Sequence, residues 1–143
     1  QGWLAALKNE NIKAIAAYEP GSGFIFPEGQ VPEPISYLGG TLRGNPVPME
    51  DFKKITRIPI VIYYGDYIPK VPSKYPGEEQ WRAAVLMAKK WTDLVNEYGG
   101  DVTLVQLPEK GLKGNTHFPM SDLNNKDVAD LLSKWLNEKG FNK

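Results

Sequence analysis

The sequence predicts an α/β domain in which helices connect parallel strands. Apolar runs of strand length alternate with amphipathic stretches of helical length, and this alternation is typical of right-handed βαβ units in a doubly wound arrangement. The run Ile58–Tyr64 is almost continuously apolar, as expected for a parallel strand that is covered on both faces. With 143 residues, 41% of them hydrophobic, the chain has the size of one domain with a buried core.

The chain opens with a short helix followed by a strand. Trp3, Leu4 and Leu7 have the spacing of an amphipathic helix, and the polar stretch KNEN interrupts it. The apolar run Ile12–Tyr18 follows and ends before a Pro-Gly pair. We predict the end of a helix and then a buried strand.

Residues 20–50 form the longest connection between predicted elements. This segment is rich in Pro and Gly and contains several aromatic residues. A connection of this length without regular structure is unusual inside a domain, and such segments tend to be lids or binding loops. We expect a lid or pocket-lining loop, with Phe24 and Phe26 lining a substrate pocket; the alternative is a loosely packed insertion.

The second half of the chain repeats the strand and helix order. After the strand at Ile58–Tyr64, apolar residues recur every three or four positions over Glu78–Tyr98, which predicts a long helix that ends at a Gly-Gly pair. Val102–Leu107 predicts the third strand, and a closing helix follows with Asn124 or Asn125 as its N-cap. We assign the tryptophans on these helix stripes to the core: Trp81, Trp91 and Trp135.

Composition and charge argue against several classes of function. The 17 basic and 17 acidic residues balance, so no basic face suggests nucleic acid as a partner. The chain has no cysteine, which excludes thiolate nucleophiles and disulfides, and its single histidine argues against a metal site. No apolar run is long enough to span a membrane, and no motif calls for a cofactor.

The candidate site lies where the loops after the three strands meet. In an open parallel sheet, ligands bind beyond the carboxyl ends of the strands. The loops there begin at Glu19, at Gly65-Asp66 and at Glu109, and the last one carries His117. A carboxylate after one strand and a histidine after a later one have the order of acid and base in a nucleophile–acid–base hydrolase. Glu19 and Asp66 are both candidates for the acid, although Asp66 also suits a turn that caps backbone amides.

Four segments together have a familiar pattern: GWLAALKNENIKAIAAYEPG, IPIVIYYGDYIP, WRAAVLMAKKWTDLVNEYGGDVTLVQLP and KGNTHFPMSDLNNKDVADLLSKWLNEKG. They resemble the C-terminal half of bacterial α/β-hydrolase-fold esterases whose triad acid is a glutamate after the sixth strand. The resemblance covers nearly the whole chain, residues 1–143, as a single C-terminal portion of such a domain, and it implies Glu19 as the acid and His117 as the base. Phe118, beside the histidine, is a further candidate for the substrate pocket.

The resemblance also implies that the nucleophilic serine lies upstream of Gln1. The serines of this chain have no nucleophile-elbow sequence, and the chain begins with glutamine rather than methionine, so we expect it to be a piece of a longer protein with an N-terminal companion segment or chain. The expected function is serine hydrolysis of carboxylic esters without a cofactor, with this chain inactive alone. The alternative is a non-catalytic α/β module that binds a small molecule or a partner.

Overall fold

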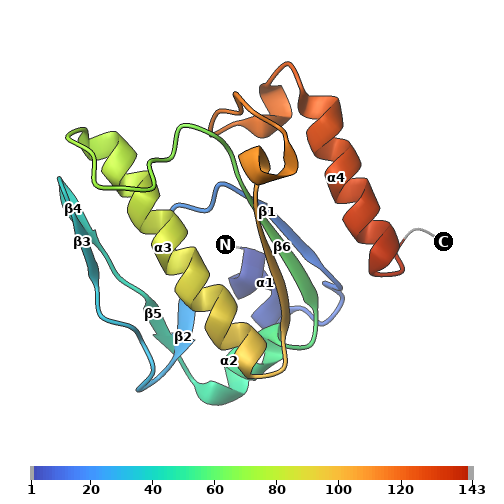
Figure 1. The fold of residues 1–143 in the computed structure, drawn as a ribbon. Helices are drawn as coiled ribbons and strands as arrows, with labels where there is room; N and C mark the ends of the chain where they lie inside the picture. The colour runs from blue at the N-terminus through green and yellow to red at the C-terminus, as the bar shows by residue number, and fades with distance from the viewer. Residues whose placement is uncertain (1, 142–143) are drawn as a thin grey trace.

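The centre of the structure, a computed structural model that describes residues 2–141, is a three-stranded parallel sheet (Figure 1). Its strands are β1 (Ile15–Tyr18), β6 (Pro59–Tyr64) and β7 (Asp101–Gln106), in the order β1-β6-β7. The parallel α/β architecture predicted from the sequence is therefore confirmed. The first strand starts later than predicted because the amide of Ile12 donates to the carbonyl of Asn9 and belongs to the preceding turn.

Helices cover both faces of the sheet (Figure 1). The helices α1 (Gly2–Lys8), α2 (Met49–Ile55) and α3 (Pro76–Glu97) pack on one face, and α4 (Asn125–Glu138) packs on the other. Two short 3-10 helices, η1 (Leu107–Lys110) and η2 (Pro119–Ser121), lie between β7 and α4. The long helix α3 begins at a proline, whose missing amide hydrogen costs nothing in the first turn of a helix.

The connection after β1 is not the loop without regular structure that we predicted. It contains four strands of three residues each, namely β2 (Ile25–Pro27), β3 (Ile35–Tyr37), β4 (Gly40–Leu42) and β5 (Asn45–Val47), and it leads into α2. The strands β2 and β5 pair in parallel, whereas β3 and β4 form an antiparallel hairpin. Strands this short show no period in the sequence, and the partners β2 and β5 are separated along the chain by the β3–β4 hairpin.

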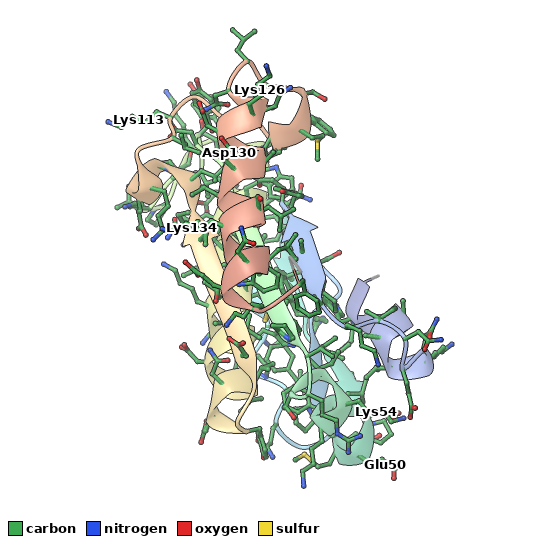
Figure 2. All side chains as sticks on the ribbon, turned by 90° about the vertical axis from the view of Figure 1, so that its right-hand side faces the viewer. Glu50, Lys54, Lys113, Lys126, Asp130 and Lys134 are labelled. Atoms are coloured by element: carbon green, nitrogen blue, oxygen red, sulfur yellow. The ribbon has the colours of Figure 1, made fainter. Side chains whose placement is uncertain are left out.

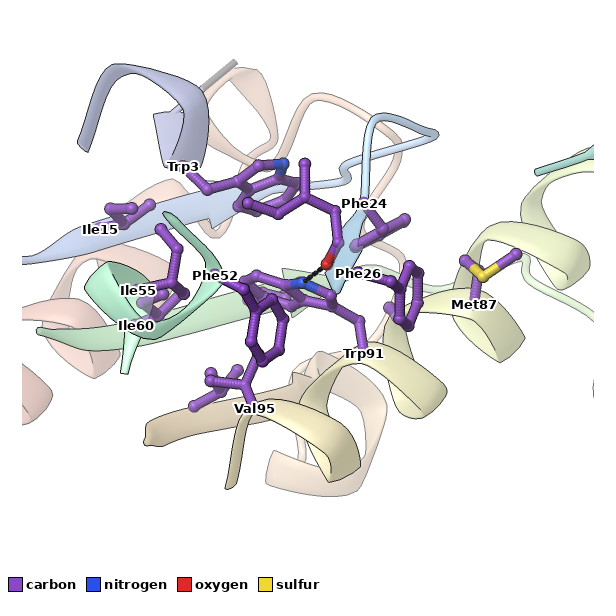
Figure 3. Close-up of a cluster of buried hydrophobic side chains, with 14 of the residues drawn as sticks. Trp3, Ile15, Phe24, Phe26, Phe52, Ile55, Ile60, Met87, Trp91 and Val95 are labelled. Atoms are coloured by element: carbon purple, nitrogen blue, oxygen red, sulfur yellow. Dashed lines mark hydrogen bonds between the residues drawn. The ribbon is translucent and has the colours of Figure 1, made fainter. Parts of the chain in front are cut away.

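The aromatic residues at the start of this connection belong to the main hydrophobic core (Figure 3). Phe24 and Phe26 are 0% and 1% exposed, and the ring of Phe24 lies 5.4 Å from that of Trp3. Trp91 lies beside them, and its indole nitrogen donates to the carbonyl of Ile25 at 2.8 Å. Contrary to our expectation, Phe24 and Phe26 do not face a substrate pocket; burying them ties β2 to α1 and α3.

The other face of the sheet carries a smaller core under α4. Val128 and Trp135 of this helix are buried against Val61 and Tyr63 of β6. The solvent-exposed residues of α4 include Lys126, Asp130 and Lys134 (Figure 2). Between residues 2 and 141, neither α4 nor any other helix combines the length and apolar composition needed to cross a membrane.

Candidate functional site

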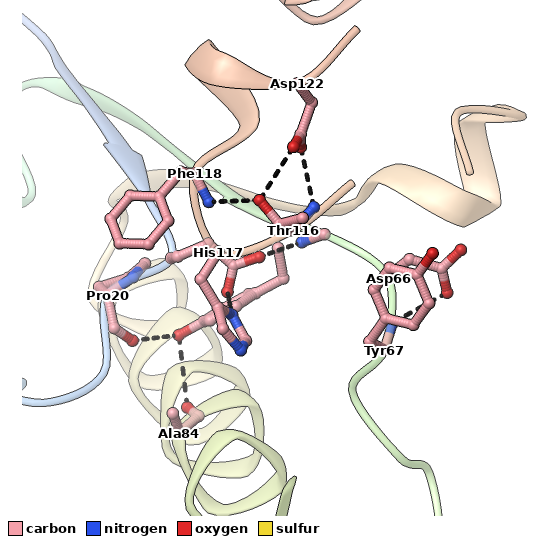
Figure 4. Close-up of polar contacts among 11 residues, drawn as sticks. Pro20, Asp66, Tyr67, Ala84, Thr116, His117, Phe118 and Asp122 are labelled. Carbon is pink, nitrogen blue, oxygen red and sulfur yellow. Dashed lines mark hydrogen bonds and ion pairs between the residues drawn. The ribbon is translucent and has the colours of Figure 1, made fainter. Parts of the chain in front are cut away.

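The structure brings Glu19 and His117 together at the carboxyl end of the sheet (Figure 4). The Nδ1 atom of His117 lies 3.1 Å from the Oε2 atom of Glu19, and the other carboxylate oxygen, Oε1, accepts a hydrogen bond from the amide of Gly65. The Glu19 side chain is 2% exposed, whereas the imidazole is 34% exposed. The pair thus has a buried acid and a histidine that solvent or a ligand can reach.

Glu19 holds its position through its backbone as well as its side chain. Its amide donates to the carbonyl of Tyr63 at 2.9 Å, which continues the pairing of β1 with β6 by one residue. Its φ angle is +51°, a left-handed conformation that is uncommon for a residue with a side chain. Such backbone strain gathers at functional sites, where the surrounding structure maintains it.

The electrostatics of Glu19 reflect two opposing effects. Burial raises the pKa of the Glu19 carboxyl, while the amide of Gly65 and the imidazole of His117 lower it by favouring the charged form. On balance burial prevails and the pKa of Glu19 is raised, so the two partners offset only part of the cost of burying the charge. The carboxylate fixes the Nδ1 side of the imidazole and leaves Nε2, which has no hydrogen-bond partner among residues 2–141, for proton transfer.

A second carboxylate shapes the loop that carries His117. Asp122 accepts hydrogen bonds from the amide of Thr116 at 2.8 Å and from its hydroxyl at 2.9 Å (Figure 4). The Thr116 hydroxyl oxygen in turn accepts from the amide of Phe118 at 3.1 Å. His117 therefore lies between Thr116, which is bonded to the Asp122 carboxylate, and Phe118, whose amide is bonded to the Thr116 hydroxyl. Asp122 was not among the site residues predicted from the sequence, and its position five residues after His117 was the available signal.

Two asparagines, Asn115 and Asn124, connect the histidine loop to the start of α4. The Asn115 side chain is 0% exposed, and its amide nitrogen donates to Asn124 Oδ1 at 2.7 Å while Asn124 donates back at 3.0 Å. Asn124 occupies the N-cap position of α4, as one of our two predictions had it, but its side chain bonds to Asn115 and makes no cap hydrogen bond. The helix start and the histidine loop are thereby joined.

Asp66, the alternative acid, has a different role in the structure. Its two carboxylate oxygens accept hydrogen bonds from the amides of Tyr67 at 3.0 Å and Gly114 at 2.9 Å. These amides lower the pKa of Asp66, with the Gly114 amide contributing most. The carboxylate caps backbone amides, as the turn interpretation predicted, and it ties the loop after β6 to the histidine loop.

Trp81, which we assigned to the core, does pack against the main core, and it also belongs to the site. Its ring stacks on the imidazole of His117, with ring centroids 3.9 Å apart and an angle of 20° between the planes. The side chain is only partly buried, unlike Trp91 and Trp135. Trp81 lies near the start of α3, and the start of a helix that follows a parallel strand lies at the carboxyl end of the sheet; that position was the signal available in the sequence.

The remaining predicted site residue, Phe118, lies beside the pair with a side chain that is 66% exposed. It is therefore accessible to a ligand, in contrast to Phe24 and Phe26. Among residues 2–141, no three His, Cys, Asp or Glu side chains gather in a way that could hold a metal ion.

Of the comparisons with known proteins, the one with solved structures found a similarity. No protein-family model matches the chain, and no curated protein matches it. Among solved structures, the chain is similar to a novel bacterial esterase determined at atomic resolution, with 28% sequence identity and a TM-score of 0.67. The match covers 96% of this chain but only 34% of the esterase, so the chain spans about a third of that protein's length. This similarity supports a relationship to hydrolases and a hydrolase-like α/β fold.

Proposed function

We propose that this chain supplies the acid and the base of a serine hydrolase that acts on carboxylic esters. The observation that carries the proposal is the 3.1 Å contact between a buried carboxylate, Glu19, and the accessible imidazole of His117. The similarity to a bacterial esterase and the resemblance of the segments around both residues support the same function. The chain is then the C-terminal portion of an α/β-hydrolase domain.

In the proposed mechanism, the imidazole of His117 moves one proton in each half of the reaction. Its Nε2 takes the proton of the serine hydroxyl as the serine oxygen bonds to the ester carbonyl carbon, and it returns that proton to the departing alcohol. Water then attacks the acyl-enzyme in the same way and releases the acid. Glu19 holds the proton on Nδ1 and stabilises the imidazolium that forms in each half.

The nucleophile in this proposal is a serine from a segment or companion chain that precedes Gln1. The esterase that this chain resembles is about three times as long as the matched part, which is consistent with further elements in the whole protein. The 143-residue chain alone should be inactive, because hydrolysis without the nucleophile loses nearly all of the rate enhancement. The chemistry needs no cofactor.

The test compares the two candidate acids in the intact protein. Glu19→Gln keeps an oxygen for the Gly65 amide, but its amide group would donate to Nδ1 and impose the wrong tautomer on His117. We expect kcat for a p-nitrophenyl ester to fall by about 10³–10⁴-fold. Asp66→Asn is the matched control; it weakens one loop hydrogen bond and should keep kcat within about tenfold.

A larger loss for Asp66→Asn than for Glu19→Gln would transfer the acid role to Asp66. Labelling by a fluorophosphonate probe tests the nucleophile separately, because the probe reacts with an activated serine. If the intact protein neither takes up the probe nor hydrolyses esters, the chain belongs to a non-catalytic binding module.

A further inference from the structure

We propose that Trp81 is a positioning residue for His117, whose indole face holds the imidazole plane and favours its protonated form. The ring centroids lie 3.9 Å apart with 20° between the planes, so the contact is face to face rather than edge on. Glu19 contacts the imidazole in its plane at Nδ1. The two contacts come from different directions and together restrict both rotations of the histidine side chain.

Trp81 is itself held by the surrounding structure. It lies in the second turn of α3, a 22-residue helix, and packs against the main core. A side-chain carbon placed at Gly21 would lie 3.6 Å from the outer edge of its indole ring, so the loop that follows Glu19 borders the ring. The indole therefore stands between the start of α3 and the histidine loop, with limited freedom to move.

The charged groups near the imidazole contact it from other elements or are paired with other groups. Glu19 faces it from the end of β1, and Asp122 acts from the η2 segment through Thr116. At the end of β6, the carboxylate of Asp66 is bonded to backbone amides. On α3, the charged side chains of Glu79 and Arg82 form an ion pair with each other at 2.6 Å. The contact between this helix and the imidazole is made by the uncharged indole of Trp81.

A cation over an indole face is attracted by the negative face of the ring, whereas a neutral imidazole gains less. Trp81 should therefore stabilise imidazolium more than imidazole. If the proposed function holds, the stronger stabilisation of imidazolium lowers the activation barrier of ester hydrolysis, because His117 becomes positively charged as it takes the serine proton. The effect on protonation itself does not depend on that function.

The test uses the fact that His117 is the sole histidine of the 143 residues. Its imidazole Cε1 proton gives one NMR signal that can be followed against pH in the 143-residue chain. We expect Trp81→Leu to move the titration midpoint to lower pH by about 0.4 to 0.7 unit, and Trp81→Phe, which keeps a smaller aromatic face, to move it by less. Phe118→Leu is the matched control, since it removes an adjacent exposed aromatic ring and should leave the midpoint unchanged.

Two results would overturn the proposal. One is a midpoint in folded Trp81→Leu that equals the parent value; the other is the absence of the upfield ring-current shift that a stacked indole imposes on the imidazole protons of the parent. Because neither readout requires catalysis, failure of the esterase proposal would leave the result interpretable. In an active intact protein, Trp81→Leu should lower kcat with little change in KM.

Discussion

At the scale of single residues, the site depends on Gly65, which the sequence indicated only as the start of a loop. Gly65 follows β6 and donates its amide to Glu19. A side-chain carbon at this position would lie 2.7 Å and 2.8 Å from the carbonyl oxygens of Asn115 and Thr116, and 2.9 Å from Glu19 Oε1. Glycine is needed here for the close approach of three chain segments, because real side-chain carbons do not come so near to backbone oxygens.

We predict that Gly65→Ala destabilises the protein by about 1–3 kcal/mol, because backbone atoms must shift to make room. Urea unfolding checks this value. Gly77→Ala is the control, since Gly77 lies in the first turn of α3 with open space around the added carbon; it should be neutral or stabilising by up to about 1 kcal/mol. Equal effects of the two substitutions would show that Gly65 is not sterically restricted.

At the scale of elements, the sequence predicted the strands and helices that have a clear hydrophobic period. β6, β7, α3 and α4 lie within a few residues of their predicted bounds, and the two residues placed after β1 and β7 by chain order do meet. The short strands between β1 and α2 were not predictable, because three-residue strands show no period and β2 pairs with β5 across the intervening hairpin. Trp81 was missed for a related reason: its helical spacing suits the core, and only the tertiary structure turns it toward the histidine.

The loop between η1 and α4 should act as one cooperative unit. The buried Asn115 side chain bonds to Asn124 and, at 3.1 Å, to Asp122, which also holds Thr116. We predict that Asn115→Ala lowers the free energy of unfolding by about 1–3 kcal/mol, since it removes the hydrogen bonds that the buried Asn115 side chain makes with the half-buried Asn124 and Asp122.

Hydrogen exchange should locate that effect. The amides of residues 114–122 should lose protection in Asn115→Ala, while those of β6 change only with global stability. Asn125→Ala is the neighbouring control, because Asn125 is exposed and its side chain makes one long contact of 3.3 Å. Unchanged protection of the loop in Asn115→Ala would show that the asparagine pair does not order it.

At the scale of the whole molecule, each face of the sheet carries its own hydrophobic core. The larger core on the α3 side contains three aromatic rings in mutual contact, those of Trp3, Phe24 and Trp91, and it anchors the helix that carries Trp81. The smaller core under α4 contains Tyr63, whose ring stacks on that of Tyr18 at 5.2 Å. Alternate residues of β6 thus serve both cores, so the strand couples them.

This arrangement predicts a loss of stability in alkali. Burial, with a smaller contribution from the neighbouring Tyr18 and Glu138 charges, raises the pKa of Tyr63 to about 12 from its ordinary value near 10. The folded state keeps the phenolic proton between these pH values while the unfolded state loses it, so unfolding becomes easier as pH rises. Each such tyrosine contributes a slope of up to about 1.4 kcal/mol per pH unit.

We therefore expect the free energy of unfolding to fall more steeply between pH 10 and about 12 in the parent than in Tyr63→Phe, which has no proton to lose there. Urea unfolding at several pH values measures the two slopes, and Tyr67→Phe, at a side chain that is 68% exposed, is the control that should keep the parent slope. Parallel slopes for the parent and Tyr63→Phe would mean that Tyr63 ionises equally well in the folded protein. In that case the α4 side of the sheet would admit water to the phenol, and the smaller core would contribute less to stability than its buried side chains indicate.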